Sequence, residues 1–284
     1  MARQLHPLEL LGAGTGPVAV VVAHPDDEII GAGHLLRSLP DAVIIYVTDG
    51  APHDMADARA AGCMTREAYA ERRRRERAAA LTEVGLGPDR TRDLGAVDQQ
   101  ASYELSALAL RLRATLDALR PAAVLTHSYE GGHPDHDATA FIVHAAAGPQ
   151  LGSSRRPTTR GGAPPIIELT SYHASGGRRV VGVFIPHPAA GPEVSLALTA
   201  AARRRKARLY AYHRSQIRVL ADCQVDVERF RRAPAYDFSR PPHAGVLWYE
   251  RFGWGMPGGG RQWRALAAAA RAELGLVRSD GGSP

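Results

Sequence analysis

Histidine and carboxylate side chains, the common protein ligands of catalytic metals, concentrate in two short stretches of this sequence. Residues 24–28 are HPDDE, and residues 131–136 are GGHPDH. Clustered ionisable groups are costly to desolvate unless something compensates their charge. Two histidines and one carboxylate around a divalent cation, with one position open for water, are typical of catalytic zinc sites. The two stretches together predict a metal centre, although the first alone also fits the acidic start of a helix.

Each of these stretches directly follows an apolar run. Residues 17–23 (PVAVVVA) precede the first stretch, and residues 122–127 (AAVLTH) precede the second. Short apolar runs rich in β-branched residues predict buried strands of a parallel sheet. Because ligands of open α/β sheets bind beyond the carboxyl ends of the strands, we expect both stretches to meet at one edge of the sheet.

The rest of the chain alternates between strand and helix patterns. This alternation predicts an α/β fold with a Rossmann-like, mostly parallel sheet and helices on both faces. C-terminal strands and a helix are expected to complete the pocket around the predicted metal centre. Further strands are expected at residues 41–50, 89–100, 166–174 and 178–186. Helices are expected at residues 28–40, 65–85, 102–121, 137–148 and 192–220.

The domain organisation is expected to be simple. We predict one domain over residues 1–284, with its core at about 17–220 and a C-terminal extension at 221–284. Residues 148–165 are rich in Pro, Gly, Ser and Arg and predict a mobile surface loop. Residues 51–64 show little periodicity and predict another loop.

Composition and charge disfavour a nucleic-acid-binding protein and a membrane protein. The net charge of +6 comes largely from arginines such as those at 72–75 and 203–206, which lie in helical patterns without an aromatic and basic platform. We therefore expect no nucleic-acid partner. No apolar run approaches the roughly 20 residues of a membrane span, so no stable membrane association is expected. Two distant cysteines and the lack of a signal-peptide pattern favour the cytoplasm.

The two His-Pro-Asp stretches, AHPDDE and GGHPDHDA, resemble the paired signatures of the LmbE-like, or PIG-L, family of zinc-dependent de-N-acetylases. Three weaker elements add to the resemblance. They are an R-x-x-E helix ending at a glycine (Arg73, Glu76, Gly85), the loop LGAVDQQ with Asp98, and K-x₆-H-x-S-Q (Lys206, His213, Ser215, Gln216). The resemblance covers roughly residues 17–220.

This resemblance implies a role for each matching position. His24, Asp27 and His136 match the metal ligands. Asp26 matches the general base, and His133 the group that, as a cation, stabilises the oxyanion or protonates the leaving amine. The resemblance also implies that Arg73 and Asp98 bind substrate and that Asp135 orients a histidine. For Arg73, the alternative of a solvated helix arginine stays open. For Asp98, an ordinary loop acid stays open, as does Asp93 in its place.

The activity that the resemblance implies is removal of an N-acetyl group from an N-acetylglucosamine-type conjugate, a small molecule, with release of acetate. The cofactor expected is Zn²⁺, with Fe²⁺ as the alternative. Amidase activity on a thiol or antibiotic conjugate, or a non-catalytic Rossmann-like module, stays open, as does homo-oligomerisation. A non-haem Fe(II) oxygenase shares the ligand types but is usually a jelly-roll barrel, which the alternating pattern disfavours.

Overall fold

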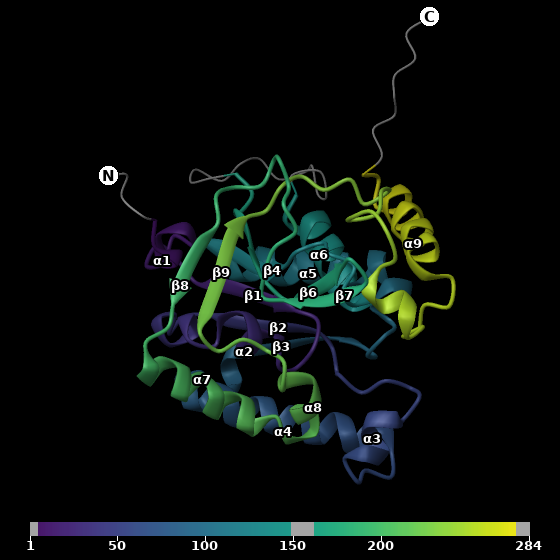
Figure 1. Ribbon diagram of the computed structural model, residues 1–284. Coiled ribbons are helices and arrows are strands. Elements are labelled where there is room, and N and C mark those ends of the chain that lie inside the picture. The colour runs from purple at the N-terminus through teal and green to yellow at the C-terminus, as the bar shows by residue number, and fades with distance from the viewer. Residues whose placement is uncertain (1–4, 149–161, 277–284) are drawn as a thin grey trace, which may run out of the picture.

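Buried strands form the centre of the computed structural model, which describes residues 5–148 and 162–276 (Figure 1). The seven strands of the main sheet lie in the order β3-β2-β1-β4-β5-β9-β8. Strands β1 to β5 run parallel, and β9 is antiparallel to both of its neighbours. The predicted mostly parallel sheet is therefore confirmed. The bounds are β1 Val18–Val22, β2 Val43–Thr48, β3 Thr91–Ala96, β4 Ala123–His127, β5 Ile166–Leu169, β8 Val194–Ala197 and β9 Val227–Arg232.

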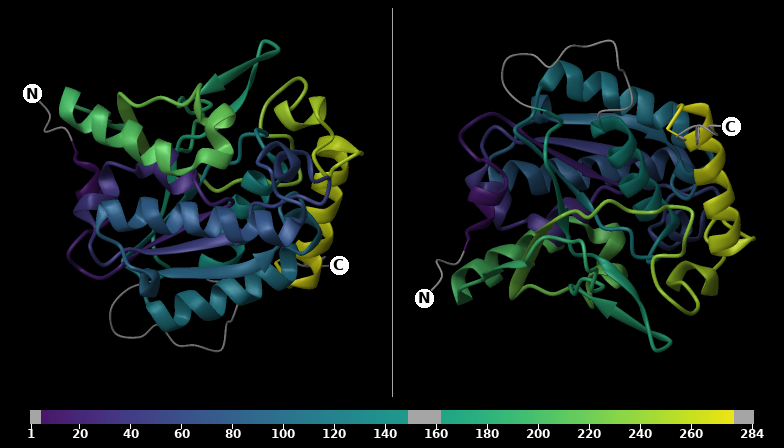
Figure 2. Two further views of the ribbon diagram at one scale, coloured as in Figure 1. Left: turned by 90° about the horizontal axis from the view of Figure 1, so that it is seen from below. Right: turned by 90° about the horizontal axis from the view of Figure 1, so that it is seen from above.

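Helices cover both faces of this sheet, as predicted (Figures 1 and 2). Because side chains alternate along a strand, Val20 of β1 joins one core cluster and Val21 joins the other. The first cluster includes side chains of α2, α4 and α7, and the second includes side chains of α5, α6 and α9. The bounds are α2 Asp27–Ala32, α4 Arg66–Val84, α5 Leu105–Leu119, α6 Pro134–Ala147, α7 Ala200–Tyr212 and α9 Gly259–Glu273.

The C-terminal half differs most from expectation. The long helix predicted over 192–220 is wrong, because the chain there forms strand β8, helix α7 and the short helix α8 (Ile217–Leu220). Alternating buried and exposed residues make 194–198 a sheet edge, and the Thr199 side chain then accepts the Ala202 N–H to begin α7. The expected strand over 166–174 divides into β5 and β6 (Tyr172–Ser175), and β6 pairs with β7 (Arg178–Val181) in a separate hairpin.

Short elements complete the fold. The helix expected over 28–40 stops at Ala32 and is followed by a 3₁₀ turn, and the loop expected over 51–64 contains α3. Strand β9 lies inside the main sheet although it follows the predicted core boundary at 220. Most of the loop expected at 148–165 lies outside the described residues. The remaining bounds are α1 Pro7–Leu10, η1 Leu35–Ser38, α3 Ala56–Ala60, η2 Pro88–Arg90, η3 Ala101–Tyr103, η4 Arg214–Gln216 and η5 Trp248–Arg251.

Strands β1 and β4 position the two His-Pro-Asp stretches. They are adjacent and parallel, with Val21 opposite Thr126, so the residues that follow each strand leave the sheet side by side. Helix α2 begins within the first stretch, at Asp27, and α6 begins within the second, at Pro134. Within the described residues, no helix combines the length and apolarity needed to cross a membrane.

Candidate metal centre

His24 and Asp27 lie close together at the end of β1. The His24 backbone N–H donates to Asp27 Oδ2 at 2.7 Å, and His24 Nδ1 lies 3.2 Å from the same oxygen. On its other side, His24 Nε2 lies 3.1 Å from Asp98 and 3.4 Å from Asp135. Burial opposes a charge on His24, but these three carboxylates raise its pKa well above the usual value. The ring therefore lies in a strongly negative environment that favours a cation.

Asp27 also joins the two stretches, because its carboxylate contacts two histidines from the β4 side. Asp27 Oδ1 lies 3.3 Å from His136 Nε2, and Oδ2 lies 3.3 Å from His127 Nε2. Burial, and then the proximity of His127, lower the pKa of His136 to about 3. A neutral imidazole has a free nitrogen lone pair, which is the form that binds a metal.

His127 is a member of this cluster that sequence reasoning missed. It is the last residue of β4, is buried, and stacks on His136 with ring centroids 4.1 Å apart. Its Nε2 also accepts the Ala23 backbone N–H at 3.1 Å. The available signal was a histidine at the carboxyl end of a predicted strand, immediately before the second stretch.

His133 lies beside the same cluster as the N-cap of α6. Its Nδ1 accepts the Asp135 backbone N–H at 3.1 Å, and its ring meets His24 edge-on at 4.5 Å. Burial, and then the proximity of His24 and His136, hold the pKa of His133 well below its usual value. Burial and these two neighbours favour the neutral ring over the cationic His133 that the resemblance implies. Because Nδ1 is an acceptor, the neutral ring carries its proton on Nε2.

Asp26 is held by Arg73, which extends from α4. Arg73 Nη2 lies 3.0 Å from Asp26 Oδ2, and the guanidinium also donates to the carbonyls of Pro25 and Gly50 at 3.0 and 2.8 Å. Burial raises the pKa of Asp26 to about 7, and Arg73 opposes that rise. Arg73 is 3% exposed, so the structure gives it protein partners in place of an open face for substrate.

Two of the weaker elements of the resemblance, the R-x-x-E helix and K-x₆-H-x-S-Q, contact one another. Glu76 of α4 accepts hydrogen bonds from the backbone and hydroxyl of Ser215, at 3.1 and 2.5 Å. Gln216 Nε2 donates to the Tyr69 hydroxyl at 2.6 Å. These contacts attach α4 to the turn after α7. Through α4 they fix the position from which Arg73 reaches Asp26.

Asp135 fixes the loop that carries Asp98. Its carboxylate accepts the backbone N–H groups of Gln99 and Ala101 at 2.6 and 3.2 Å, and it is fully buried. It also lies 3.4 Å from His24 Nε2, the contact through which we propose that it orients this histidine. Asp98 is buried and faces His24, while Asp93 lies apart and pairs with Arg77.

The side chains in this cluster suit a divalent cation. Among the described residues, the groups whose ligand atoms lie within 4.8 Å of one another are His24-His133-His136, Asp27-His127-His136 and His24-Asp98-His133-Asp135. Neutral imidazoles together with carboxylates suit Zn²⁺ or Fe²⁺. The predicted ligand set of His24, Asp27 and His136 draws on these overlapping groups and fits such an ion.

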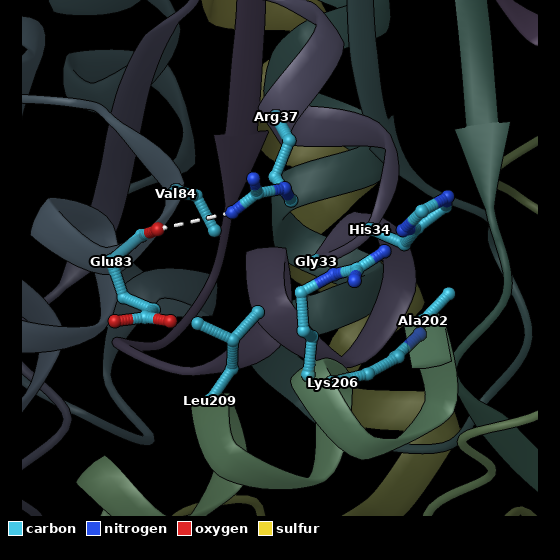
Figure 3. Close-up of a pocket in the computed structure, with 9 residues that line it drawn as sticks. Gly33, His34, Arg37, Glu83, Val84, Ala202, Lys206 and Leu209 are labelled. Carbon is cyan, nitrogen blue, oxygen red and sulfur yellow. Dashed lines mark hydrogen bonds between the residues drawn. The ribbon is translucent and has the colours of Figure 1, made fainter. Parts of the chain in front are cut away.

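A separate small crevice lies between the end of α2, the end of α4 and helix α7 (Figure 3). None of the predicted site residues lines it. In its wall, Lys206 is already paired with Glu228, and Arg37 donates to the Glu83 carbonyl. The crevice is therefore distinct from the candidate metal centre. Its lining residues are Gly33, His34, Arg37, Glu83, Val84, Ala202, Arg205, Lys206 and Leu209.

Residues 19–147 match the family model of the PIG-L GlcNAc-PI de-N-acetylases, and this segment contains every residue predicted for the site. The 1D-myo-inositol 2-acetamido-2-deoxy-alpha-D-glucopyranoside deacetylases of Mycobacterium sp. strains KMS and JLS are each 31% identical over 148 residues. That alignment covers 44% of this chain and 48% of each relative, so the chain spans about half the length of the curated relatives it matches.

Solved structures with the same fold extend the likeness over more of the chain. The N,N'-diacetylchitobiose deacetylase from Pyrococcus horikoshii has a TM-score of 0.56 at 18% identity, covering 84% of this chain and 91% of that one. The A40926 pseudoaglycone deacetylase Dbv21 also has a TM-score of 0.56 at 18% identity, covering 78% and 98%. A zinc-inhibited form of the teicoplanin deacetylase Orf2 has a TM-score of 0.55 at 15% identity, covering 78% and 100%. Residues 19–147, which carry both His-Pro-Asp loops, are therefore similar to the PIG-L/LmbE-like de-N-acetylases, and the chain shares its fold with these solved deacetylases.

Proposed function

We propose that this chain is a metal-dependent hydrolase that removes the N-acetyl group from an N-acetylglucosamine-type conjugate, giving acetate and a free amine. The observation that carries the proposal is the contact of Asp27 with both His24 and His136, beside Asp26. The curated relatives, which are deacetylases of an inositol-linked amino sugar, support the substrate class. The family and the parallel sheet disfavour the oxygenase alternative.

His24, Asp27 and His136 would hold the metal in this proposal. When bound there, a Zn²⁺ or Fe²⁺ ion supplies Lewis-acid activation of water and of the amide carbonyl. Asp26 accepts the proton of the attacking water, and its pKa of about 7 suits a base that works near neutral pH. Arg73 keeps the carboxylate oriented.

His133 would serve the other half of the reaction. Its Nε2–H would donate a hydrogen bond that stabilises the oxyanion formed as the amide carbonyl is attacked. The proton taken by Asp26 then goes to the departing nitrogen, and the C–N bond breaks. The products are acetate and the free amino sugar. Asp98, beside His24, is proposed to accept a hydrogen bond from a sugar hydroxyl.

Acetate release from a panel of N-acetylglucosamine conjugates by metal-loaded protein tests this function. Wild type is expected to release acetate, and Asp26→Asn to lower kcat by about 10²- to 10⁴-fold while keeping its metal. His136→Ala is expected to lose both activity and metal. The control His6→Ala alters the exposed N-cap histidine of α1 and should retain both.

Other outcomes would change the assignment. If Asp26→Asn leaves acetate release unaffected, Asp26 is not the general base. Release of another acyl group, with none of acetate, would favour the amidase alternative. Tight metal binding with no hydrolysis of any amide in the panel would favour the non-catalytic module.

A further inference from the structure

An aromatic segment borders the metal centre and lies outside the family-matched residues. It comprises residues 247–256, which precede α9 near the C-terminal end of the described chain (Figure 1). Trp254 lies against the His133 ring with centroids 4.9 Å apart, and Phe252 stacks on Trp254 at 4.7 Å with an interplanar angle of 14°. Trp248 meets Phe252 edge-on at 5.4 Å. We call Trp248, Phe252 and Trp254 the aromatic wall.

Backbone and side-chain contacts fix this wall to both loops of the site. The Trp248 backbone N–H donates to the Gly131 carbonyl at 2.8 Å, which joins the wall to the second His-Pro-Asp loop. The Tyr103 hydroxyl donates to the Gly255 carbonyl at 2.6 Å, which joins it to the loop that follows Asp98. The position of Trp254 is therefore set by the same loops that carry His133 and Asp98.

Glycines on either side of Trp254 allow the backbone of this segment to lie close to the loop that carries Gln99. Gly253 and Gly255 have φ angles of 68° and 64°, which glycine adopts readily. A Cβ at Gly255 would lie 2.4 Å from the Gln99 carbonyl oxygen. The sequence Phe-Gly-Trp-Gly thus presents an aromatic ring toward the site in a conformation that other residues would strain.

The wall leaves aromatic surface uncovered next to the site. Phe252 is 53% exposed, and Trp248 and Trp254 are half-buried. Aromatic rings gain stability when a further flat group packs on them. Because the inner end of the wall touches His133, a group bound on it would be connected to the reacting amide rather than bound independently.

Polar side chains beside the wall indicate what kind of group this is. Gln99 and Gln100 are half-buried and precede Ala101, and Gln100 Nε2 would lie 3.2 Å from a Cβ at Gly255. Within the described residues, neither amide side chain makes a hydrogen bond to protein. A pyranose ring has an apolar C–H face, which packs on an aromatic ring, and an edge of hydroxyls, which amide groups can bind. An alkyl chain would use only the aromatic half of this arrangement.

We propose that the aromatic wall, with Gln99 and Gln100, is a subsite for a second sugar ring attached to the amino sugar. This inference rests on the proposed function, because it assigns the wall to the same substrate. It predicts that the preferred substrate is an N-acetylglucosaminyl glycoside of another pyranose rather than a single sugar.

Three probes test this subsite in metal-loaded protein. They are methyl N-acetylglucosaminide, N-acetylglucosaminyl-galactose and octyl N-acetylglucosaminide. Wild type is expected to prefer the disaccharide over the methyl glycoside in kcat/KM, mainly through KM. Phe252→Ala is expected to lower that preference by about tenfold, in line with one lost aromatic contact. Trp254→Phe should keep most of the preference. Tyr212→Ala changes a partly exposed aromatic on α7 and should leave the ratio unchanged.

Two further outcomes distinguish a failure of the proposed subsite from a failure of the proposed activity. An unchanged ratio in Phe252→Ala, or an octyl glycoside that depends on Phe252 more than the disaccharide does, would overturn the sugar subsite. If wild type hydrolyses none of the probes, the proposed function fails, and the subsite is then tested by tryptophan fluorescence. A saturable change with N-acetylglucosaminyl-galactose in wild type, weakened in Phe252→Ala, would support the subsite, and no change at millimolar disaccharide would exclude it.

Discussion

Two groups of buried charges in this protein differ in how completely their members are paired. In the first group, Glu228 of β9 accepts the ammonium of Lys206 at 2.8 Å and the backbone N–H groups of His34 and Leu35 at 2.7 and 3.0 Å. Lys206 donates its second hydrogen bond to the Ile30 carbonyl at 2.8 Å. One anion meets one cation, and the surrounding donors and acceptors complete the set.

The metal centre is the second group, and its charges do not balance. Four buried carboxylates, those of Asp26, Asp27, Asp98 and Asp135, surround it. Arg73 pairs with the first of them and the carboxylates favour a cation at His24, while burial and mutual proximity keep His133 and His136 neutral, so negative charge remains in excess. The comparison teaches that a balanced buried cluster joins elements of the fold, whereas an unbalanced one is suited to bind a cation. Each prediction below tests one side of that difference.

The largest expected effect concerns the balanced pair. Lys206→Met leaves the Glu228 carboxylate buried without its cation and should destabilise the protein by about 3–5 kcal/mol. Urea unfolding of the metal-free protein measures this loss. Arg204→Met, an exposed change on the same helix, should cost far less. Adding Glu228→Gln to Lys206→Met should recover part of the stability, and a further loss of similar size would show that the pairing is not the cause.

The second prediction concerns the unbalanced centre. Asp27→Asn removes the carboxylate that contacts three histidines. Loss of a residue that only orients a metal ligand weakens metal binding by about 10- to 100-fold, so loss of a ligand itself should weaken it by more than about 100-fold. Metal content after dialysis and acetate release both measure this change. The free energy of unfolding of the metal-free variant should stay close to that of wild type. A variant that retained one metal ion per chain would exclude Asp27 as a ligand.

The third prediction concerns the stability that the protein gains when a cation binds. Zn²⁺ at about 100 times its Kd should stabilise wild type by about 2.7 kcal/mol, because the ion binds the folded chain preferentially. Lys206→Met should gain a similar amount, since its centre is intact, and Asp27→Asn should gain much less. Thermal unfolding with and without metal measures these gains. Equal stabilisation of all three proteins would indicate that the ion binds elsewhere.

The smallest expected effect concerns the partly compensated Asp26. Arg73 lowers the pKa of this carboxyl, and the base must be deprotonated to act, so activity should rise with pH through that pKa. Arg73→Met removes the nearby positive charge and should move the midpoint to higher pH. A shift of about one unit lowers kcat/KM near pH 7 by up to about tenfold.

A pH profile of kcat/KM measures the effect of Arg73→Met. A bound divalent cation adds positive charge and should place the wild-type midpoint below 7. Arg75→Met on the exposed face of α4, where Arg75 pairs with Glu71, is the matched control and should not move the profile. Loss of activity without a shift in midpoint would mean that Arg73 acts through structure alone.

Much of the centre could be predicted from the sequence because its residues are adjacent in two stretches at strand ends. The positions of His24, Asp27, His133 and His136 near one another follow from the order of apolar runs and polar loops. The contacts of Arg73 could not be predicted, because burial of a helix arginine depends on how α4 packs against the loops after β1 and β2. His127 was missed because it belongs to an apolar strand pattern.

The C-terminal half was harder to predict, and the reason is physical. Strand β8 is a four-residue edge strand next to a long helix, so the helical pattern extended over it. The aromatic wall has no periodicity, because its rings are positioned by two glycines and by contacts with residues more than 100 positions away. Such long-range contacts leave no local signal in the sequence.

The hydrogen bond from the Trp248 backbone to the Gly131 carbonyl has an evolutionary consequence. Main-chain contacts do not depend on which side chains the partners carry, so they persist while those side chains change. The side chains of Trp248, Phe252 and Trp254 can therefore diverge in sequence, while Gly253 and the reacting groups on the loops after β1 and β4 stay in place. With the proposed subsite, a change of preferred substrate requires new side chains only in this segment, and the reacting residues remain unchanged.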